Sequence, residues 1–358
     1  METYDISNKM LRSITFLIVF LISMHNVYGQ ISFYGKNVKP GTKEHFKIPI
    51  TANNQTTFIP ITVFCGTETG PTLGITAGVH GYEYPPIIAA QQLIKRINPK
   101  KLKGVIILVQ IANLASFSER SPFINPLDKK NLNRMFPGDK EGSISEQIAA
   151  FITENVIARS DFFLDIHGGD ASEDLYSYSA YYSNSNMPDV SEKAKEMAKS
   201  LLFSYVVVFN TNGKKYMLPE EPSLYCSAEA FKRGIPSVDI ECGKLGKSDQ
   251  GLVSKIEDGV FNMLKHLKML DQRPIVHQNK SYTFIENRTW QSSNHDGIFY
   301  PTKQSGDHVE KGMKLGIITD YFGNTLETVY AEKSGIILII VGTPPVNKGE
   351  TIVVIGKI

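Results

Sequence analysis

The stretch "PTLGITAGVHGYEYPP" (residues 71–86) contains the features from which the fold is predicted. It begins with an apolar run typical of a buried strand, and glycines then turn the chain. Pro85 and Pro86 suit the first turn of a helix. His80 and Glu83 are three residues apart, so at a helix start both side chains lie on one face and can bind one ion. Alone, such a pair is weak evidence for a metal site, because these residue types often meet at this spacing by chance.

Apolar, β-rich runs alternate with longer amphipathic segments from about residue 60 to residue 270. This alternation is typical of an α/β fold, in which helices flank a mixed, mostly parallel sheet. The expected strands are 72–78, 104–112, 162–167, 205–210 and 236–241. The expected helices are 85–97, 143–158, 191–203 and 251–270.

The C-terminal part, from about residue 281 to residue 358, has a different pattern. Short β-rich stretches and glycine turns follow one another there without a convincing helix, which predicts a small all-β unit. We expect the α/β domain to span residues 30–275 and the C-terminal β domain to span residues 276–358.

Residues 1–29 have the layout of a secretory signal peptide. Lys9 and Arg12 precede an apolar stretch from Ile14 to Ile22, and small and polar residues follow up to Gly29. We expect cleavage after Gly29 and export to the periplasm or the extracellular space. An uncleaved N-terminal membrane anchor is the alternative, although the apolar core is short for a span of about 20 residues.

Composition limits the classes of partner. The 358 residues carry a formal net charge of +2, and their lysines and arginines are scattered, so a nucleic-acid partner is not expected. No membrane association is predicted beyond the signal segment. Cys65, Cys226 and Cys242 allow at most one disulfide, which excludes a disulfide-based scaffold.

A third candidate ligand is His167, which ends the predicted strand in "FFLDIHGGD" (162–170). Ligands of open α/β sheets bind outside the carboxyl ends of the strands, so His80, Glu83 and His167 can converge there. Imidazole and carboxylate groups suit zinc, and a catalytic zinc takes three protein ligands. The alternative is that His167 is a turn histidine without a ligand.

Two further features supply polar groups for the same sheet edge. Glu241 ends the strand "PSVDIE" (236–241), where a carboxylate could take a proton from an attacking water and pass it to a leaving amine. Taken singly, however, a glutamate is more often an ordinary surface residue. The long polar loop 118–139 contains arginines and an asparagine suited to binding a carboxylate or stabilising an oxyanion: Arg120, Asn133 and Arg134. A solvated basic loop is the alternative.

Four motifs in this order, "GVHGYE", "NLNRMFPG", "DIHGG" and "DIECGKLG", resemble the succinylglutamate desuccinylase/aspartoacylase family, relatives of the zinc carboxypeptidases. The resemblance spans about residues 70 to 270. It implies a zinc carboxypeptidase-like α/β domain, and the C-terminal unit is similar to the small barrel-sandwich domain of this family. Members often have an acidic residue where this chain has Asn131.

The resemblance also implies roles for individual residues. His80, Glu83 and His167 would bind one Zn²⁺ per chain, and Glu241 would be the general base and acid. Asn133 and Arg134 would hold a carboxylate or carbonyl of the substrate. Arg120 is only the nearest candidate for a second arginine, which would stabilise the oxyanion.

The function expected from this resemblance is that of a zinc-dependent amide hydrolase whose substrate carries a carboxylate. A deacylase of N-acyl amino acids is the first reading, and an exported carboxypeptidase acting on peptides or cell-wall fragments is the second. A non-catalytic binding protein that keeps the zinc fold is the third. The C-terminal unit would shape or cover the site, or would assemble protomers into a homo-oligomer.

Overall fold

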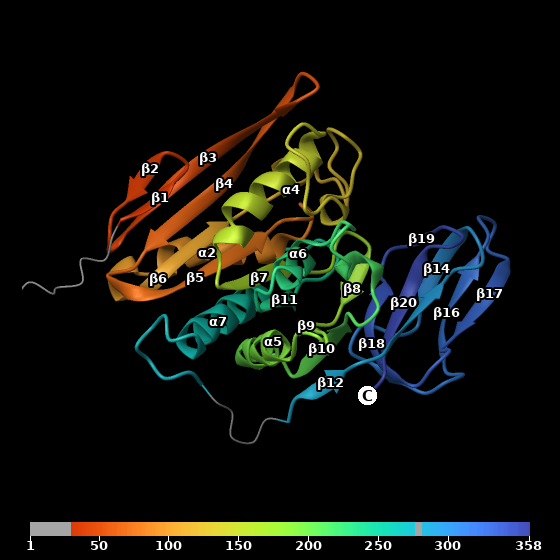
Figure 1. The fold of residues 1–358 in the computed structure, drawn as a ribbon. Coiled ribbons are helices and arrows are strands. Elements are labelled where there is room, and N and C mark those ends of the chain that lie inside the picture. Colours follow the sequence, from red (N-terminus) through yellow and green to blue (C-terminus); the bar gives the residue numbers. More distant parts are fainter. Residues whose placement is uncertain (1–29, 276–280) are drawn as a thin grey trace, which may run out of the picture.

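The computed structural model describes residues 30–275 and 281–358 (Figure 1). The predicted signal peptide lies outside these residues, and the predicted domain boundary at 276 falls at the edge of the gap. Within the described ranges no helix is both long and apolar enough to cross a membrane.

A large mixed sheet forms the centre of the molecule, and its nine strands lie in the order β12-β10-β9-β11-β7-β5-β6-β4-β3. The central strands β11, β7, β5 and β6 are parallel, as are β12, β10 and β9. β9 and β11 are antiparallel, and β4 is antiparallel to both β6 and β3. The strands are β3 (Thr42–Ala52), β4 (Gln55–Cys65), β5 (Glu68–Ala77), β6 (Lys103–Val109), β7 (Phe162–His167), β9 (Tyr178–Ser183), β10 (Tyr205–Asn210), β11 (Ser237–Glu241) and β12 (Thr283–Ile285).

Helices cover both faces of this sheet, which confirms the predicted α/β architecture (Figure 1). α2 (Tyr84–Arg96), α5 (Pro188–Ser200) and α7 (Gln250–His266) pack on one face, and α4 (Ile144–Asn155) and α6 (Cys226–Lys232) pack on the other. The shorter elements are α3 (Leu114–Glu119), η1 (Pro99–Lys101), η2 (Leu132–Arg134), η3 (Ile157–Arg159), η4 (Lys215–Met217) and the β1 (Ile31–Phe33) and β2 (Lys36–Val38) pair.

The two faces of the sheet account for the apolar runs in the central strands. Along β6, Ile106 and Leu108 belong to the core beneath α2, α5 and α7, whereas Val105 and Ile107 belong to the core beneath α4 and α6. Successive side chains of a strand point to opposite faces, so a strand covered on both sides must be apolar throughout.

β5, β7 and β11 determine where the polar residues meet. They are neighbours in the sheet and run parallel, so their carboxyl ends lie at the same edge. His167 and Glu241 are paired residues in the register of β7 and β11. The loop that follows β5 carries His80 and Glu83 to the same edge.

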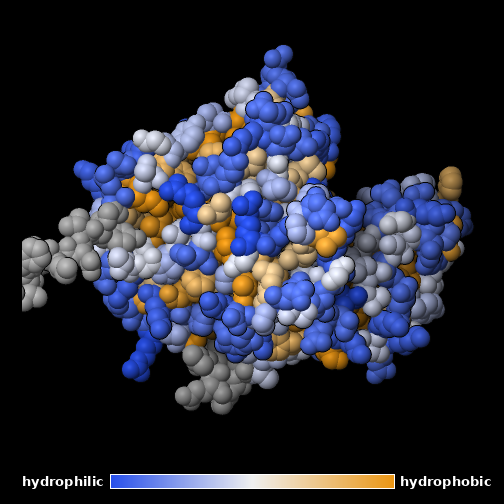
Figure 2. Space-filling view, viewed as in Figure 1, coloured by the Kyte–Doolittle hydropathy of each residue, from blue (hydrophilic) through white to orange (hydrophobic). Residues whose placement is uncertain are grey.

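The C-terminal strands form two antiparallel sheets packed around a common apolar core. One sheet has the order β13-β20-β18-β15, with β8 added beside β18, and the other has the order β17-β16-β14-β19. In the space-filling view this unit forms a lobe beside the main body (Figure 2). The strands are β8 (Glu173–Leu175), β13 (Arg288–Ser292), β14 (Gly297–Pro301), β15 (His308–Val309), β16 (Lys314–Thr319), β17 (Thr325–Tyr330), β18 (Gly335–Val341), β19 (Pro345–Val346) and β20 (Thr351–Gly356).

β8 joins the two parts of the chain, because it comes from the α/β domain and pairs with β18. Asp174 in β8 accepts hydrogen bonds from Ser305 N–H at 2.9 Å and from Ser305 Oγ at 2.8 Å. Lys244 Nζ lies 3.0 Å from the same carboxylate. This polar cluster fastens the C-terminal unit next to the loop that follows Glu241.

Candidate active site

The loop between β5 and α2 requires glycine at a close approach of two backbones. A Cβ atom on Gly81 would lie 2.1 Å from the backbone nitrogen of Phe117, so no other residue fits without movement. Gly81 N–H donates a hydrogen bond to Ser116 Oγ at 3.1 Å. Glu83 then occupies the N-cap position of α2, and prolines form the first turn as expected. These constraints hold Glu83 beside His80.

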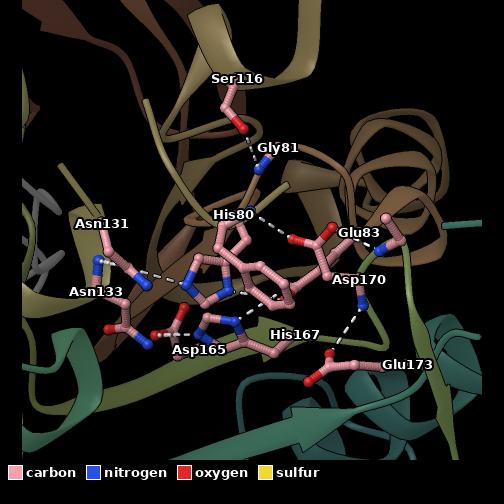
Figure 3. A network of polar contacts seen from close by, with 12 residues as sticks. His80, Gly81, Glu83, Ser116, Asn131, Asn133, Asp165, His167, Asp170 and Glu173 are labelled. Carbon is pink, nitrogen blue, oxygen red and sulfur yellow. Dashed lines mark hydrogen bonds and ion pairs between the residues drawn. The ribbon is translucent and has the colours of Figure 1, made fainter. Parts of the chain in front are cut away.

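The three candidate ligands meet at one point, with their ligand atoms all within 4.8 Å of one another (Figure 3). His80 Nδ1 lies 2.8 Å from Glu83 Oε1, and His167 Nδ1 lies 3.1 Å from Glu83 Oε2. Glu83 and His167 are buried, and His80 exposes 12% of its side chain. Two imidazoles and one carboxylate at this spacing match the donor set of a catalytic zinc, which leaves a coordination position open.

Each histidine also has a polar partner on its far nitrogen. His80 Nε2 lies 3.2 Å from Asn131 Oδ1, and His167 Nε2 lies 3.0 Å from Asp165 Oδ2. Asn131 Oδ1 already accepts the N–H of Asn133 at 2.8 Å, so it is an acceptor toward His80 as well. Both Nε2 atoms therefore donate, and both Nδ1 atoms carry the lone pair that a metal would take.

The electrostatics of the cluster favour a charged Glu83. Burial raises the pKa of this carboxyl, but the charges and hydrogen bonds of His167 and His80 outweigh burial and bring the pKa to about 2. Burial lowers the pKa of His167, whereas Asp165 and Glu83 raise it and prevail. A charged Glu83 between two imidazoles fits the donor set of a metal site.

Glu241 is surrounded by other acidic groups. Burial raises its pKa well above the ordinary value; His167 opposes this shift, and the negative charges of Glu83, Asp239 and Glu173 add to it. Burial likewise raises the pKa of Asp239 and of Glu173, each to about 7. A carboxyl of raised pKa is suited to proton transfer near neutral pH.

Asn133 and Arg134 lie in η2, whose N-cap is Asn131. Asn133 Oδ1 accepts the N–H of Cys226 at 3.0 Å, which fixes the amide. Arg134 stacks on Tyr225, with its guanidinium carbon 4.7 Å from the ring centroid, and Nη1 donates to Asn133 O at 2.7 Å. Its guanidinium forms no ion pair with any carboxylate of the described residues.

A cavity of about 790 Å³ brings most of the predicted residues together. His80, Glu83, His167, Glu241, Asn133 and Arg134 all line it. Arg120 does not. It ends α3 in the left-handed conformation, with φ of 54°, and lines a different cavity beside Tyr84 and Phe117.

Sequence reasoning missed several residues of the site. Asp165 has a signal in the sequence, since it is two residues before His167 in one strand and must share its face. Arg288 and Trp290 also line the cavity but come from β13 in the C-terminal unit. No local pattern near residue 288 indicates this, because the docking of that unit brings β13 to the cavity.

Comparisons with known proteins agree with this geometry. The family model of the succinylglutamate desuccinylase/aspartoacylase catalytic domain matches residues 69–267. An N-alpha-acetyl-L-2,4-diaminobutyric acid deacetylase from Halomonas elongata is 29% identical over 322 residues, covering 87% of this chain and 90% of the relative.

Solved structures share the fold over nearly their whole length. A succinylglutamate desuccinylase/aspartoacylase from Rhodobacter sphaeroides has a TM-score of 0.76 at 25% identity, covering 91% of this chain and 97% of its own. The product-bound ectoine utilization protein EutE (DoeB) from Ruegeria pomeroyi has a TM-score of 0.78 at 22% identity, with coverage of 92% and 99%. The chain therefore belongs to the succinylglutamate desuccinylase/aspartoacylase family and is a hydrolase of the deacylase kind.

Proposed function

We propose that this chain is a zinc-dependent deacylase that hydrolyses the amide bond of an N-acyl amino acid or a similar carboxylate-bearing substrate. One observation carries the proposal: His80, Glu83 and His167 place their ligand atoms within 4.8 Å of one another in the cavity that Glu241 also lines. A zinc ion bound by such ligands polarises a carbonyl and makes water a stronger nucleophile.

Glu241 is the proposed proton-transfer group. It removes a proton from water as the water oxygen bonds to the amide carbon, and it then gives this proton to the nitrogen as the carbon–nitrogen bond breaks. The products are a carboxylate and an amine. The raised pKa of Glu241 supports both steps. A carboxylate of higher pKa is a stronger base toward water, and an ordinary carboxylate of low pKa would be a weaker one.

Asn133 and Arg134 are the proposed binding groups for the substrate carboxylate. The guanidinium carbon of Arg134 lies 4.7 Å from the ring centroid of Tyr225, and the guanidinium keeps N–H groups for a contact with a carboxylate. Arg120 has no part in this proposal, since its side chain lines the other cavity.

The test is a screen of the purified mature chain, loaded with zinc, against N-acyl amino acids and against peptides with the same C-terminal residue. Release of a primary amine is measured. Faster turnover of the N-acyl amino acids supports the deacylase. Turnover of peptides alone would favour the carboxypeptidase reading. No turnover, together with full biological activity of Glu241→Gln, would favour a binding protein.

We further propose that residues 1–29 direct export and are removed, which rests on their sequence pattern alone. Cell fractionation and N-terminal sequencing of the isolated protein test this. A protein that begins at Gln30 outside the cytoplasm is expected, and an intact Met1 in the cytoplasmic fraction would contradict it.

A further inference from the structure

Three residues that line the cavity form one row across neighbouring strands. Glu241 in β11 is paired with His167 in β7 on one side and with Tyr178 in β9 on the other. The side chains of paired residues point to the same face of a sheet, and all three residues line the cavity. Tyr178 is therefore the immediate neighbour of the proposed general base, on the side away from the metal ligand.

Tyr178 is buried, although its hydroxyl has no hydrogen-bond partner. The residue exposes only 4% of its surface and belongs to an apolar cluster with Val207, Ile336 and Leu338. No group of residues 30–275 and 281–358 forms a hydrogen bond with its hydroxyl. The hydroxyl of a buried tyrosine usually finds a partner. Since Tyr178 lines the cavity, we expect that partner to come from a bound ligand.

The other tyrosines of the cavity differ from Tyr178. Tyr182 is equally buried, but its hydroxyl lies 3.0 Å from Ser227 Oγ. Tyr216 and Tyr225 are only half-buried, and they lie in η4 and just before α6 rather than in the strands of the row. Among the described residues of the cavity, Tyr178 is thus the buried tyrosine whose hydroxyl remains available to a ligand.

The hydroxyl of Tyr178 keeps its proton at neutral pH. Burial raises its pKa well above the ordinary value of 10, and the negative charge of Glu241 adds to this shift, whereas Arg288 opposes it. A neutral hydroxyl has one O–H donor and two lone pairs that act as acceptors. It can therefore accept a hydrogen bond from an N–H group of a bound substrate.

The order of the row matches the order of the atoms in an amide. In the proposed function the carbonyl oxygen is bound at the metal ligands, which include His167, and the nitrogen receives its proton from Glu241. The oxygen and the nitrogen lie on opposite sides of the carbonyl carbon, so the nitrogen is directed away from His167 and toward β9. Tyr178 stands at that end of the row.

We propose that Tyr178 is a further catalytic residue, whose hydroxyl oxygen accepts the N–H of the scissile amide. This rests on the proposed deacylase function. Holding the N–H turns the lone pair that forms on the nitrogen in the tetrahedral intermediate toward Glu241. The proton of Glu241 then passes to the nitrogen as the carbon–nitrogen bond breaks. Tyr178 itself neither gains nor loses a proton.

An ester, which lacks the N–H, tests this role. N-acetylalanine and O-acetyllactate have nearly the same shape, but an oxygen replaces the N–H in the ester. Tyr178→Phe should lower kcat/KM for N-acetylalanine by about twofold to tenfold, as for the loss of one neutral hydrogen bond. It should leave kcat/KM for O-acetyllactate unchanged. An equal fall for both substrates, or no fall for the amide, would overturn the inference.

Tyr181→Phe is the matched control. Tyr181 lies in the same strand and exposes 7% of its surface, but it belongs to the core on the opposite face of the sheet and does not line the cavity. This variant should keep both kcat/KM values. In urea, Tyr178→Phe should unfold at the same midpoint as the wild type, because its hydroxyl has no partner in the protein. A clearly lower midpoint would overturn the inference by showing that the hydroxyl serves the fold.

A binding measurement keeps this inference apart from the deacylase proposal. Calorimetry with the zinc-loaded Glu241→Gln variant compares the affinities of N-acetylalanine and O-acetyllactate without turnover. The amide should bind about twofold to tenfold more tightly, and adding Tyr178→Phe should remove the difference. If the wild type hydrolyses no N-acyl amino acid, the deacylase proposal fails, while the two affinities still decide whether Tyr178 binds the N–H. Equal affinities, or a difference that survives Tyr178→Phe, would overturn the inference.

Discussion

Asn131 holds His80 as Asp165 holds His167, but with a neutral amide in place of a carboxylate. The oxygen of Asn131 lies 3.2 Å from His80 Nε2, and that of Asp165 lies 3.0 Å from His167 Nε2. A carboxylate partner makes an imidazole a stronger electron donor than an amide does. The two proposed metal ligands therefore differ in electron-donating strength.

Asn131→Asp is expected to tighten zinc binding. The new carboxylate would make His80 more basic, while it would still accept the N–H of Asn133 that shapes η2. We expect affinity to rise by roughly tenfold and Asp165→Asn to lower it by a similar factor. Competition with a metal chelator at neutral pH measures both changes. Unchanged affinity in both variants would show that these partners do not tune the histidines.

Measurements of metal content and turnover should distinguish a proposed metal ligand, such as His80, from the proposed general base, Glu241. His80→Ala is expected to lose both zinc and activity. Glu241→Gln should keep a full complement of zinc but lose activity by roughly a hundredfold or more. His45→Ala is the control, since His45 contacts Thr62 outside the cavity and should keep both. Stoichiometric zinc in His80→Ala would refute the ligand assignment.

Glu146 should stabilise the fold in a pH-dependent way. Its Oε2 accepts from Lys130 Nζ and from the N–H and Oγ of Ser143, each at 2.8 Å, and these donors lower its pKa to about 2. A folded-state pKa below the ordinary 4.5 means that the stabilisation is complete above pH 4.5 and is lost as pH falls toward 2.

Glu146→Gln tests this by urea unfolding at several pH values. At pH 7 the variant should lose about 1 kcal/mol of unfolding free energy, the size of a cap contribution for a partly exposed group. The difference between variant and wild type should shrink as the pH is lowered below 4.5. A difference that stays constant down to pH 3 would mean that the charge of Glu146 does not matter.

Asp174→Ala should loosen the attachment of the C-terminal unit. It would leave the Ser305 N–H without its acceptor and the Lys244 ammonium without its carboxylate partner, although Lys244 still donates to Ser305 Oγ, at a cost of about 1–3 kcal/mol. Urea unfolding measures the loss. Asp296→Ala, which removes a single acceptor from an exposed turn, should cost much less. Equal losses would argue that the Asp174 cluster has no special part in joining the two units.

The central sheet was predictable because its strands are covered on both faces. β7 and β10 have the predicted bounds, and β5, β6 and β11 differ from them only at their ends. The β3–β4 hairpin was not predicted, although the alternation of buried and exposed residues along β3 is itself typical of a strand with one solvated face. Nor could local sequence show that β9 runs antiparallel to β11, because strand pairing is decided by distant residues.

The candidate site likewise contains residues that the sequence could place and residues that it could not. His80, Glu83 and His167 could be placed together because each follows or ends a strand of one parallel set, and such ends share an edge. No comparable rule predicts where the side chains of the loop 118–139 lie. Position along that loop suggested Arg120 as the second arginine, but the end of α3 takes its side chain to another cavity. Arg288, nearly 170 residues further along the chain, lies in the cavity instead.

The position of β8 has a consequence for synthesis of the protein. β8 is translated long before β18, its partner, and a strand of three residues has little stability by itself. Glu173 lines the cavity, and its surroundings are therefore complete only after the C-terminal part of the chain has been synthesised. We expect a chain released early by the ribosome to lack a finished cavity, so that only full-length molecules can be active.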